Sequence, residues 1–301
     1  MSELVIGTRG SALALAQARR VRERLEAHGH ICRIQVIRTA GDRMPEAPLP
    51  EIGGKGLFTR ELEEALLEGR IDLAVHSLKD LPVALPEGLW LAAVPEREDP
   101  RDAVVGRKLA DLPPGARVGT SSARRAAQLK LLRPDLAVEA VRGNLDTRLR
   151  KLDSGRYDAL ILAAAGLRRL GWGDRVAECL PPEQMCPAPG QGALAVETRR
   201  HGAAAEACAA LDDPAARAAV HAERGLLQVL GGGCQIPLGA YAEVYDGILR
   251  LHAVVVAPDG SRWARTTAEG NADQPDEVAR RAASRLLEAG AREILDSFCR
   301  S

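Results

Sequence analysis

The cysteine in "LGGGCQIPLG" (230–239) lies in an unusual local sequence. Cys234 follows three glycines, which permit close backbone approach and unusual backbone angles. It precedes "QIP", in which the proline restricts the turn. This setting suits a thiolate attached to a bulky group. The other cysteines are interpreted as small buried hydrophobic side chains, and they are Cys32, Cys179, Cys186, Cys208 and Cys299.

The spacing of the six cysteines predicts neither a zinc site nor a disulfide framework, because there is no CxxC pair with companion histidines. His28 and His30 flank a glycine in an expected turn. Two ligands without a third do not hold zinc, so we interpret this pair as a solvated loop and expect no metal.

Arginines gather after a Gly-Thr turn in "GTSSARR" (119–125). Arg124 and Arg125 fall in the first turn of an expected helix that has Ser121 or Ser122 as its N-cap. Exposed cations oppose the helix dipole there by roughly 0.3–1 kcal/mol each, whereas a bound anion would reverse the sign. Arg142 and Arg148 in "RGNLDTR" add two more guanidiniums. We therefore expect a polycarboxylate or phosphate ligand in a cleft between domains.

The first part of the chain has a similar arrangement in Thr8, Arg9 and Ser11. Residues 124–151 as a whole contain eight basic and three acidic side chains. Solvated helix faces are an equally good explanation for four of the basic ones, and these are Lys130, Arg133, Arg150 and Lys151.

Lys79 and Asp80 in "VHSLKDLP" (75–82) come directly after an apolar strand, where α/β domains display functional side chains. One interpretation is a surface ion pair of little energetic value. The other is a carboxylate that stabilises a cationic intermediate and moves protons. The glycines of "EIGGKGLF" (51–58) lack the GxxxxGK[ST] pattern, so a flexible flap bearing Lys55 is favoured over a nucleotide-binding loop.

The composition is that of a globular protein of two or three domains, with 301 residues, 46% hydrophobic and 3% aromatic side chains. The core must be built mainly from Leu, Val, Ile and Ala. A formal net charge of zero gives no overall attraction to nucleic acid or an anionic membrane. The N-terminus resembles no secretory signal, and no apolar run is long enough to cross a membrane, so we expect a cytoplasmic location.

The order of expected elements is that of an α/β domain with a largely parallel sheet. The sequence predicts, in order, a strand (3–7), a helix (11–29), a strand (32–39), a helix (59–69) and a strand (71–77). After the Pro- and charge-rich stretch 94–105 the chain repeats itself. "VIGTRGSA" (5–12) resembles "RVGTSSA" (117–123), and "GRIDLAV" (69–75) resembles "GRYDALI" (155–161). Two related α/β domains are favoured, although chance similarity of short Gly-Thr turns stays open.

"PAPGQGALAVE" (187–197) is a crossing followed by a strand that returns to the first domain. From residue 214 a helix, the Gly-Cys loop, strands around "YDG" and "PDGS", and a final helix near 275–298 predict a small α+β domain. The expected domains are residues 1–95 with 193–213, residues 96–192, and residues 214–301, and a double hinge joins the first two.

Beyond these local patterns, the chain resembles the porphobilinogen deaminase family, whose members are also called hydroxymethylbilane synthases. "ERGLLQVLGGGCQIPLG" (223–239) is similar to the cofactor-attachment signature of that family. The other blocks match in order along essentially all 301 residues: "GGKGLFTRELE", "DLAVHSLKDLP", "EREDPRDA", "VGTSSARRAAQL", "RGNLDTRL", "YDALILAAAGLRRLG" and "GQGALAVE".

The resemblance implies two domains like those of periplasmic binding proteins and a third, α+β domain. It implies a transferase that condenses four porphobilinogen molecules head to tail, loses four ammonia molecules and releases linear hydroxymethylbilane. A dipyrromethane cofactor would be held by a thioether to Cys234. A monomer that hands its product to the next enzyme of heme biosynthesis is also implied.

By the same resemblance, Asp80 would stabilise the azafulvenium cation formed on deamination, and Lys55 would close over the site. The residues that would bind the acetate and propionate groups of cofactor and substrate are Arg9, Ser11, Lys79, Ser122, Arg124, Arg125, Arg142, Arg148 and Arg169.

Two residues depart from the family pattern. Glu51 replaces a second flap lysine, and Gly231 replaces a common acidic residue. Two other functions are compatible with part of the sequence. A two-domain anion-binding or ligand-sensing protein would explain the arginines and the hinge, but not Cys234 or the third domain. An enzyme acting on phosphorylated substrates would need a phosphate loop or a metal-carboxylate cluster.

Overall fold

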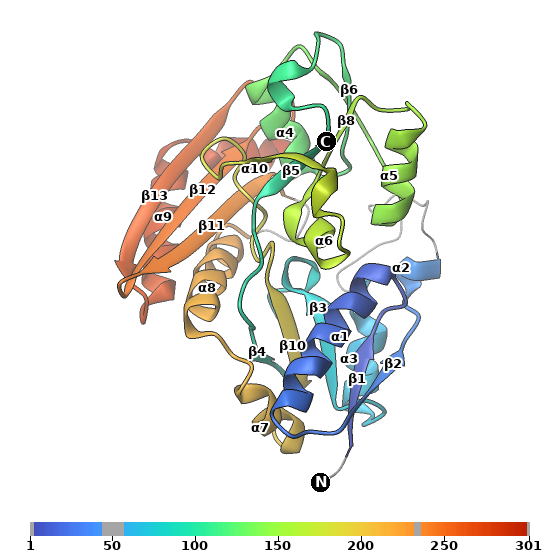
Figure 1. The fold of residues 1–301 in the computed structure, drawn as a ribbon. Helices are drawn as coiled ribbons and strands as arrows, with labels where there is room; N and C mark the ends of the chain where they lie inside the picture. The colour runs from blue at the N-terminus through green and yellow to red at the C-terminus, as the bar shows by residue number, and fades with distance from the viewer. Residues whose placement is uncertain (1–2, 44–56, 232–235, 300–301) are drawn as a thin grey trace. The chain divides into compact units, whose positions relative to one another are not determined.

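The computed structural model describes residues 3–43, 57–231 and 236–299 (Figure 1). The chain divides into two compact units, and each unit is formed from two separate segments. The first unit contains Met1–Glu98 and Ala193–Arg217, and the second contains Asp99–Gly192 and Ala218–Ser301. The chain therefore passes from one unit to the other at three points along its length.

The first unit is built on a five-stranded mixed sheet. The strands pair in the order β2 (Cys32–Val36), β1 (Leu4–Thr8), β3 (Leu73–Ser77), β10 (Leu194–Arg199) and β4 (Leu89–Ala93). β1 is parallel to β2 and β3, but β10 is antiparallel to β3 and β4. The prediction of a largely parallel sheet is confirmed, because four of the five strands of this sheet run the same way and β10 is the one that is reversed. β10 enters the sheet where β3 ends, with Leu194 opposite Ser77, so it has to run in the reverse direction.

Helices cover both faces of this sheet. Leu73 and Val75 pack in one cluster with α1 (Ala12–Ala27), and Ala74 packs in another with α3 (Arg60–Leu67). Successive side chains of a strand point to opposite faces, so β3 is buried on both sides. The remaining helical segments of this unit are α2 (Ala40–Arg43), the 3₁₀ turn η1 (Leu78–Asp80) and α7 (Ala203–Ala209).

A second five-stranded sheet lies in the second unit. Its strands pair in the order β7 (Ala137–Glu139), β6 (Arg117–Gly119), β8 (Ala159–Ala163), β5 (Asp102–Gly106) and β9 (Val176–Leu180). β6 is parallel to β7 and β8, and β5 is antiparallel to β8 and β9. The helical segments are α4 (Ala123–Leu132), α5 (Leu145–Asp153), α6 (Ala164–Arg169), η2 (Leu109–Asp111) and η3 (Gly173–Arg175).

The segments whose sequences resemble one another occupy equivalent positions in the two sheets. β1 and β6 are second in their sheets, and β3 and β8 are third. β1 and β6 have a glycine at the same point, where the side chain of a residue from a neighbouring segment packs closely. A Cβ on Gly7 would lie 2.3 Å from Ile71 Cδ1, and one on Gly119 would lie 2.5 Å from Leu160 Cδ2.

The C-terminal part of the second unit is a three-stranded antiparallel sheet with helices packed on it (Figure 1). α8 (Pro214–Val229) begins in the first unit and leads to this sheet. The predicted final helix is two helices, because Gly290 adopts a φ of 88° between them. The elements are β11 (Leu238–Tyr245), β12 (Ile248–Val256), β13 (Trp263–Asn271), α9 (Pro275–Glu288) and α10 (Ala291–Cys299).

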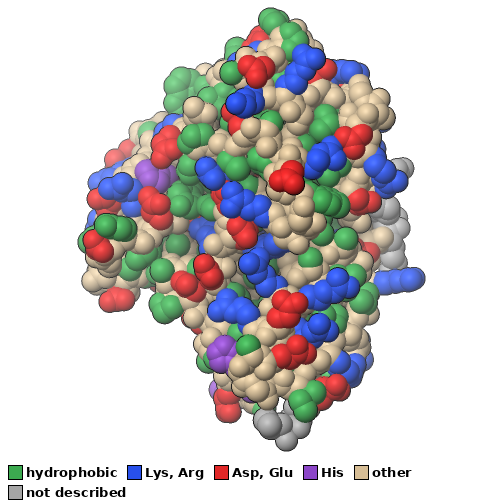
Figure 2. Space-filling model, in the orientation of Figure 1, with side chains coloured by type: hydrophobic (Ala, Val, Ile, Leu, Met, Phe, Trp, Pro, Cys, Tyr) green, Lys and Arg blue, Asp and Glu red, His purple; other side chains and the backbone are tan. Residues whose placement is uncertain are grey.

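The predicted fold class, two α/β sheets and a smaller α+β region, is confirmed. The largest fully buried side chains are leucines and isoleucines, as the shortage of aromatic residues predicted. Basic and acidic side chains are interspersed over the face shown in Figure 2, as expected for zero net charge.

Candidate functional site

The turn between β6 and α4 positions the first pair of predicted anion-binding arginines. β6 ends at Gly119, and α4 begins at Ala123 after the N-cap Ser122. Ser122 Oγ accepts a hydrogen bond from Arg125 N (3.4 Å), whereas Ser121 Oγ donates to Val141 O (2.6 Å). Of the two possible N-caps, Ser122 is therefore the one used.

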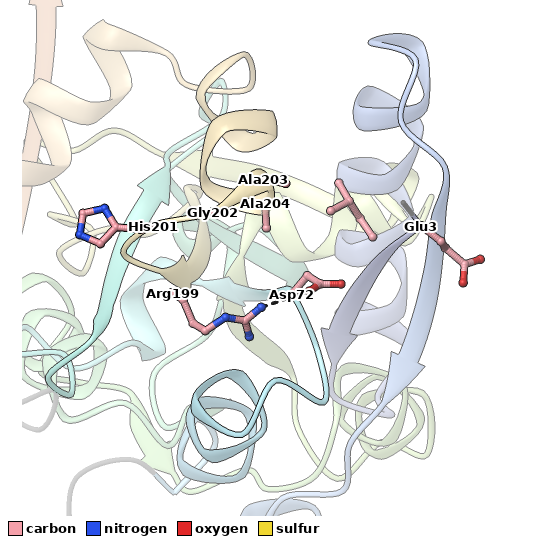
Figure 3. A pocket seen from close by; sticks show the side chains of 8 residues that line it. Glu3, Asp72, Arg199, His201, Gly202, Ala203 and Ala204 are labelled. Carbon is pink, nitrogen blue, oxygen red and sulfur yellow. Dashed lines mark hydrogen bonds and ion pairs between the residues drawn. The ribbon is translucent and has the colours of Figure 1, made fainter. Parts of the chain in front are cut away.

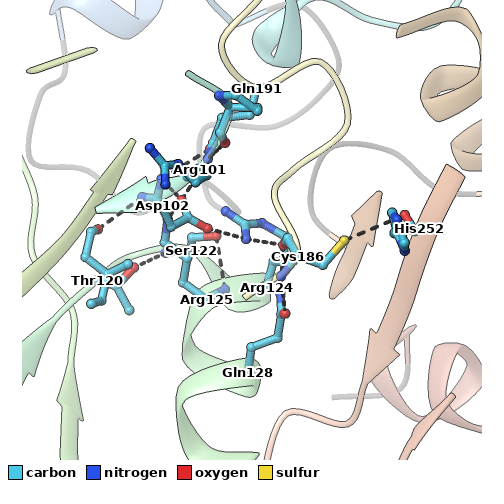
Figure 4. A network of polar contacts seen from close by, with 12 residues as sticks. Arg101, Asp102, Thr120, Ser122, Arg124, Arg125, Gln128, Cys186, Gln191 and His252 are labelled. Carbon is cyan, nitrogen blue, oxygen red and sulfur yellow. Dashed lines mark hydrogen bonds and ion pairs between the residues drawn. The ribbon is translucent and has the colours of Figure 1, made fainter. Parts of the chain in front are cut away.

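Arg124 and Arg125 are buried and share one carboxylate (Figure 4). Arg124 Nη1 lies 2.6 Å from Asp102 Oδ2, and Arg125 Nε lies 2.8 Å from Asp102 Oδ1. Burial opposes ionisation of Asp102, but the two guanidiniums hold the pKa of its carboxyl well below its usual range. Asp102 is thus an anion at neutral pH, and both arginines are held in a fixed arrangement.

Gln191 completes this cluster. Its Nε2 donates to Asp102 Oδ1 and to Pro100 O, each at 2.8 Å, and its Oε1 accepts from Arg125 Nη2 at 3.3 Å. Sequence reasoning missed Asp102 and Gln191. The available signal for Asp102 was an acidic residue at the start of the apolar run "DAVV", since such a group needs a cationic partner once it is buried.

The Arg124–Arg125–Asp102 cluster can accept a further anion. Both guanidiniums contact the Asp102 carboxylate. Arg124 Nε is buried, and among the described residues it has no hydrogen-bond partner. Buried donors are normally satisfied, so this N–H fits a ligand with carboxylate groups.

Three further predicted arginines lie elsewhere in the same unit, all half-buried. Arg142 lies in the turn between β7 and α5, and Arg148 lies inside α5, from which its Nε donates to Gly143 O in that turn (2.8 Å). Arg169, at the end of α6, donates from Nη2 to Gly192 O (2.6 Å). The structure thus brings Arg124 and Arg125 together on Asp102, and it ties Arg148 of α5 to the turn that contains Arg142.

The four basic residues interpreted as solvated do not all have the same surroundings. Lys130 and Arg150 are exposed. Arg133 pairs with Asp135 and donates to the carbonyl oxygens of two other residues, so it also stabilises a loop. Lys151 is half-buried and donates to Arg142 O (3.2 Å).

Arg9 occupies the equivalent turn of the first unit. Its Nη2 lies 2.5 Å from Asp42 Oδ1, and its guanidinium carbon lies 4.1 Å from the centre of the Phe58 ring. Burial works against ionisation of Asp42, but hydrogen bonds from Arg9 and Thr39 lower the pKa of its carboxyl. Ser11 is the N-cap of α1 and accepts from Ala14 N at 3.2 Å.

Lys79 and Asp80 follow the carboxyl end of β3, as predicted. Leu78 N donates to Ala193 O (3.0 Å), which extends the β3–β10 pairing as far as η1. Lys79 is half-buried and Asp80 is exposed. The carboxylate is therefore accessible from solvent on a short turn anchored to the sheet.

Two predicted site residues, Lys55 and Cys234, lie outside the described residues, and so does Glu51. Gly231 is described, with a φ of 71°. That backbone conformation favours glycine.

A pocket in the first unit includes Asp72, which precedes β3, whereas Asp80 follows the other end of that strand. Figure 3 shows the residues that line this pocket. It is lined by Glu3, Asp72, Arg199 and His201, with the start of α7 at one side. Arg199 pairs with Asp72 at 3.2 Å. None of the predicted site residues lines this pocket. Within the described residues no group of three or more His, Cys, Asp or Glu is placed to hold a metal ion, and no described helix has the length and apolar character needed to span a membrane.

Comparison with known proteins covers nearly the whole chain. Residues 4–207 match the family described as "Porphobilinogen deaminase, dipyromethane cofactor binding domain", and residues 217–288 match its C-terminal domain. The chain is 50% identical to the porphobilinogen deaminase of Syntrophobacter fumaroxidans over 302 residues, covering 98% of both chains. It is also 50% identical to that of Thiobacillus denitrificans, covering 99% of both.

Among solved structures, the methionine binding protein MetQ is similar over 69% of this chain and 89% of its own, with 12% identity and a TM-score of 0.43. That similarity is too low to support a conclusion. The sequence matches are sufficient by themselves: the chain belongs to the porphobilinogen deaminase family.

Proposed function

We propose that this protein is a hydroxymethylbilane synthase, a transferase of heme biosynthesis. Four porphobilinogen molecules and one water would give one linear hydroxymethylbilane and four ammonia molecules. The observation that carries this proposal is the match of residues 4–207 to the cofactor-binding domain of the family.

The residues around Asp102 fit a dipyrromethane with acetate and propionate groups. The support is the buried Nε of Arg124, which has no hydrogen-bond partner within the described part of the chain, and the two guanidiniums that share one carboxylate. We propose a thioether between the cofactor and Cys234. When bound, the dipyrromethane supplies the free pyrrole position to which the first substrate is joined.

The chain's own groups have separate roles in this proposal. Asp80 would accept hydrogen bonds from pyrrole N–H groups and offset positive charge near the reacting carbon, since its carboxylate is exposed at the end of β3. Basic and hydroxyl groups would orient the carboxylates of substrate and cofactor, and these are Arg9, Ser11, Lys55, Lys79, Ser122, Arg124, Arg125, Arg142, Arg148 and Arg169.

We also propose the three domain ranges 1–95 with 193–213, 96–192, and 214–301. A cytoplasmic location is supported by Cys32, Cys179, Cys186 and Cys208, which are all free thiols, as is usual in a reducing compartment. We propose a monomer that passes its product onward, and analytical ultracentrifugation of the purified protein tests the monomer.

Intact-mass spectrometry tests the cofactor. The purified protein should exceed its chain mass by one dipyrromethane, and Cys234→Ala should abolish the increment. Cys32→Ala is the control and should keep it. A fully active protein of unmodified mass would overturn the proposed attachment.

Asp80→Asn tests the catalytic carboxylate. The variant should fold and carry the cofactor, but its turnover should fall about a hundredfold or more. Asp111→Asn is a matched control, because Asp111 also closes an exposed 3₁₀ turn, and it should keep wild-type turnover. Unchanged turnover in Asp80→Asn would remove this residue from the reaction.

A further inference from the structure

A short segment of the second unit, residues 186–191, is hydrogen-bonded on both sides; we call it the 186–191 strap. On one side Gln128 of α4 forms a pair of bonds with Cys186, with Oε1 accepting from N (2.7 Å) and Nε2 donating to O (3.0 Å). Arg124 Nη1 donates to the same oxygen at 2.6 Å. The strap is thus bound to the helix that carries the paired arginines (Figure 4).

On its other side the strap is bound to β11. Ala240 N donates to Pro187 O at 2.8 Å. Gly239 allows the close approach, because a Cβ there would lie 2.7 Å from both Cys186 O and Cys186 Cβ. Burial raises the pKa of the Cys186 thiol to about 12, so this side chain packs as a neutral group between the strap and β11.

Glu223 of α8 joins the strap and β11 through one carboxylate. The side chain is fully buried. Its Oε2 accepts from Gly190 N (2.6 Å) and its Oε1 accepts from Ala242 N (2.7 Å). Both partners are buried backbone donors, which are costly to leave unsatisfied.

These contacts connect two places that the proposed function uses. α8 and β11 are the two segments that flank residues 230–237, the loop that contains Cys234. At its far end the strap contributes Gln191, which contacts Asp102 and Arg125. One continuous set of hydrogen bonds therefore runs from the stems of the Cys234 loop to the paired arginines.

We propose that Glu223 is a positioning residue, which holds both stems of the Cys234 loop against the 186–191 strap and so sets the attachment point relative to Arg124 and Arg125. This inference rests on the proposed function. A glutamate serves here because one side chain has to satisfy two donors on different segments, which a neutral amide with a single acceptor oxygen does not do.

Hydrogen exchange of the wild-type protein tests the contact itself. The amides of Gly190 and Ala242 share one acceptor group, so both should be protected. In Glu223→Gln the amide that faces the new NH₂ group should exchange roughly ten- to a hundredfold faster, and in Glu223→Ala both amides should do so. Exchange of the two wild-type amides at the rate of exposed amides would overturn the inference, even if no variant of Glu223 folds.

The cofactor-loaded fraction, measured by intact mass on folded protein only, tests the positioning role. Wild type should be loaded most fully, Glu223→Gln several-fold less and Glu223→Ala least. The control Glu178→Gln removes a carboxylate that accepts from Leu109 N in the second sheet, and it should load as wild type does. Full loading and wild-type turnover in both Glu223 variants would show a role in stability alone.

The two proposals fail in different ways. If the wild-type protein carries no added mass at Cys234, the proposed function is wrong while the exchange result for Gly190 and Ala242 stands. If wild type is loaded and the Glu223 variants are loaded equally, only the positioning role is wrong.

Discussion

The turns β1–α1 and β6–α4 have similar sequences but use their arginines differently. Each turn leaves a strand through Gly-Thr and enters a helix with a serine N-cap. Arg9 and its partner Asp42 keep side-chain exposures of 21% and 20%. Arg124, Arg125 and their partner Asp102 keep 4%, 7% and 0%.

Local sequence therefore determines the conformation of each turn, whereas burial determines how much the arginine contributes to stability. A partly exposed ion pair contributes little to stability and is screened by salt, so Arg9 can exchange its partner at small cost. Removal of one member of a buried ion pair is strongly destabilising. The members of the Arg124–Arg125–Asp102 cluster accordingly cannot exchange partners without a large loss of stability.

Removal of the buried carboxylate should have the largest effect. Asp102→Asn takes the counter-charge from two buried guanidiniums, and we expect the free energy of unfolding to fall by about 3–5 kcal/mol. Urea unfolding followed by circular dichroism measures it. A loss no larger than that of Asp42→Asn would mean that the two turns are energetically alike.

Acid should have the next largest effect, because it weakens the Arg124–Arg125–Asp102 cluster. The pKa of the Asp102 carboxyl in the folded protein lies below its ordinary value of 3.8, so the unfolded chain binds the proton more readily. The stability from this group is present above about pH 4 and is lost as pH falls through the folded pKa. Thermal unfolding from about pH 6 to about pH 3 should show a steeper loss for wild type than for Asp102→Asn. Parallel curves would assign the acid loss to other carboxyls.

Crowding at Gly119 in β6 should have a smaller effect on the free energy of unfolding. Gly119→Ala places a Cβ against Leu160 and the Tyr157 ring, and overpacking of this kind costs about 1–3 kcal/mol. Gly173→Ala, with nothing within 4 Å of the added Cβ, is the control. Equal unfolding free energies for the two variants would show that β6 has room for a side chain.

The partly exposed ion pair between Arg9 and Asp42 should matter least. Asp42→Asn should lower the free energy of unfolding by about 0.2–1 kcal/mol. Since salt screens exposed charges, the loss should shrink between about 0.05 M and about 1 M salt, whereas the loss for Asp102→Asn should persist. A loss for Asp42→Asn that does not depend on salt would place Arg9 in the same class as the buried arginines.

Much of the fold follows from local signals. Helices α1, α3 and α8 and strands β1, β2 and β3 lie where periodicity predicted them. β5 was missed because it begins inside a Pro- and charge-rich stretch that resembles a domain boundary. The direction of β10 was missed because strand direction depends on where a distant segment enters the sheet, which periodicity does not report.

The candidate site divides in the same way. Sequence singled out Arg124, Arg125 and Asp80, and their turns lie where it predicted. The partner of the arginines and the role of Glu223 were not visible in it. Asp102 lies 22 residues before Arg124, and Glu223 bonds to a residue 33 positions earlier. No helical or strand period connects such positions.

The sequence by itself determined the family, the order of the main elements and the turns that present the charged side chains, because these depend on motifs and on interactions between near neighbours in the chain. Only the tertiary structure decided which charges are buried and which acceptors satisfy them. Burial and pairing arise when distant segments pack, and the free energy of a charged or polar group depends on that environment more than on its sequence neighbours.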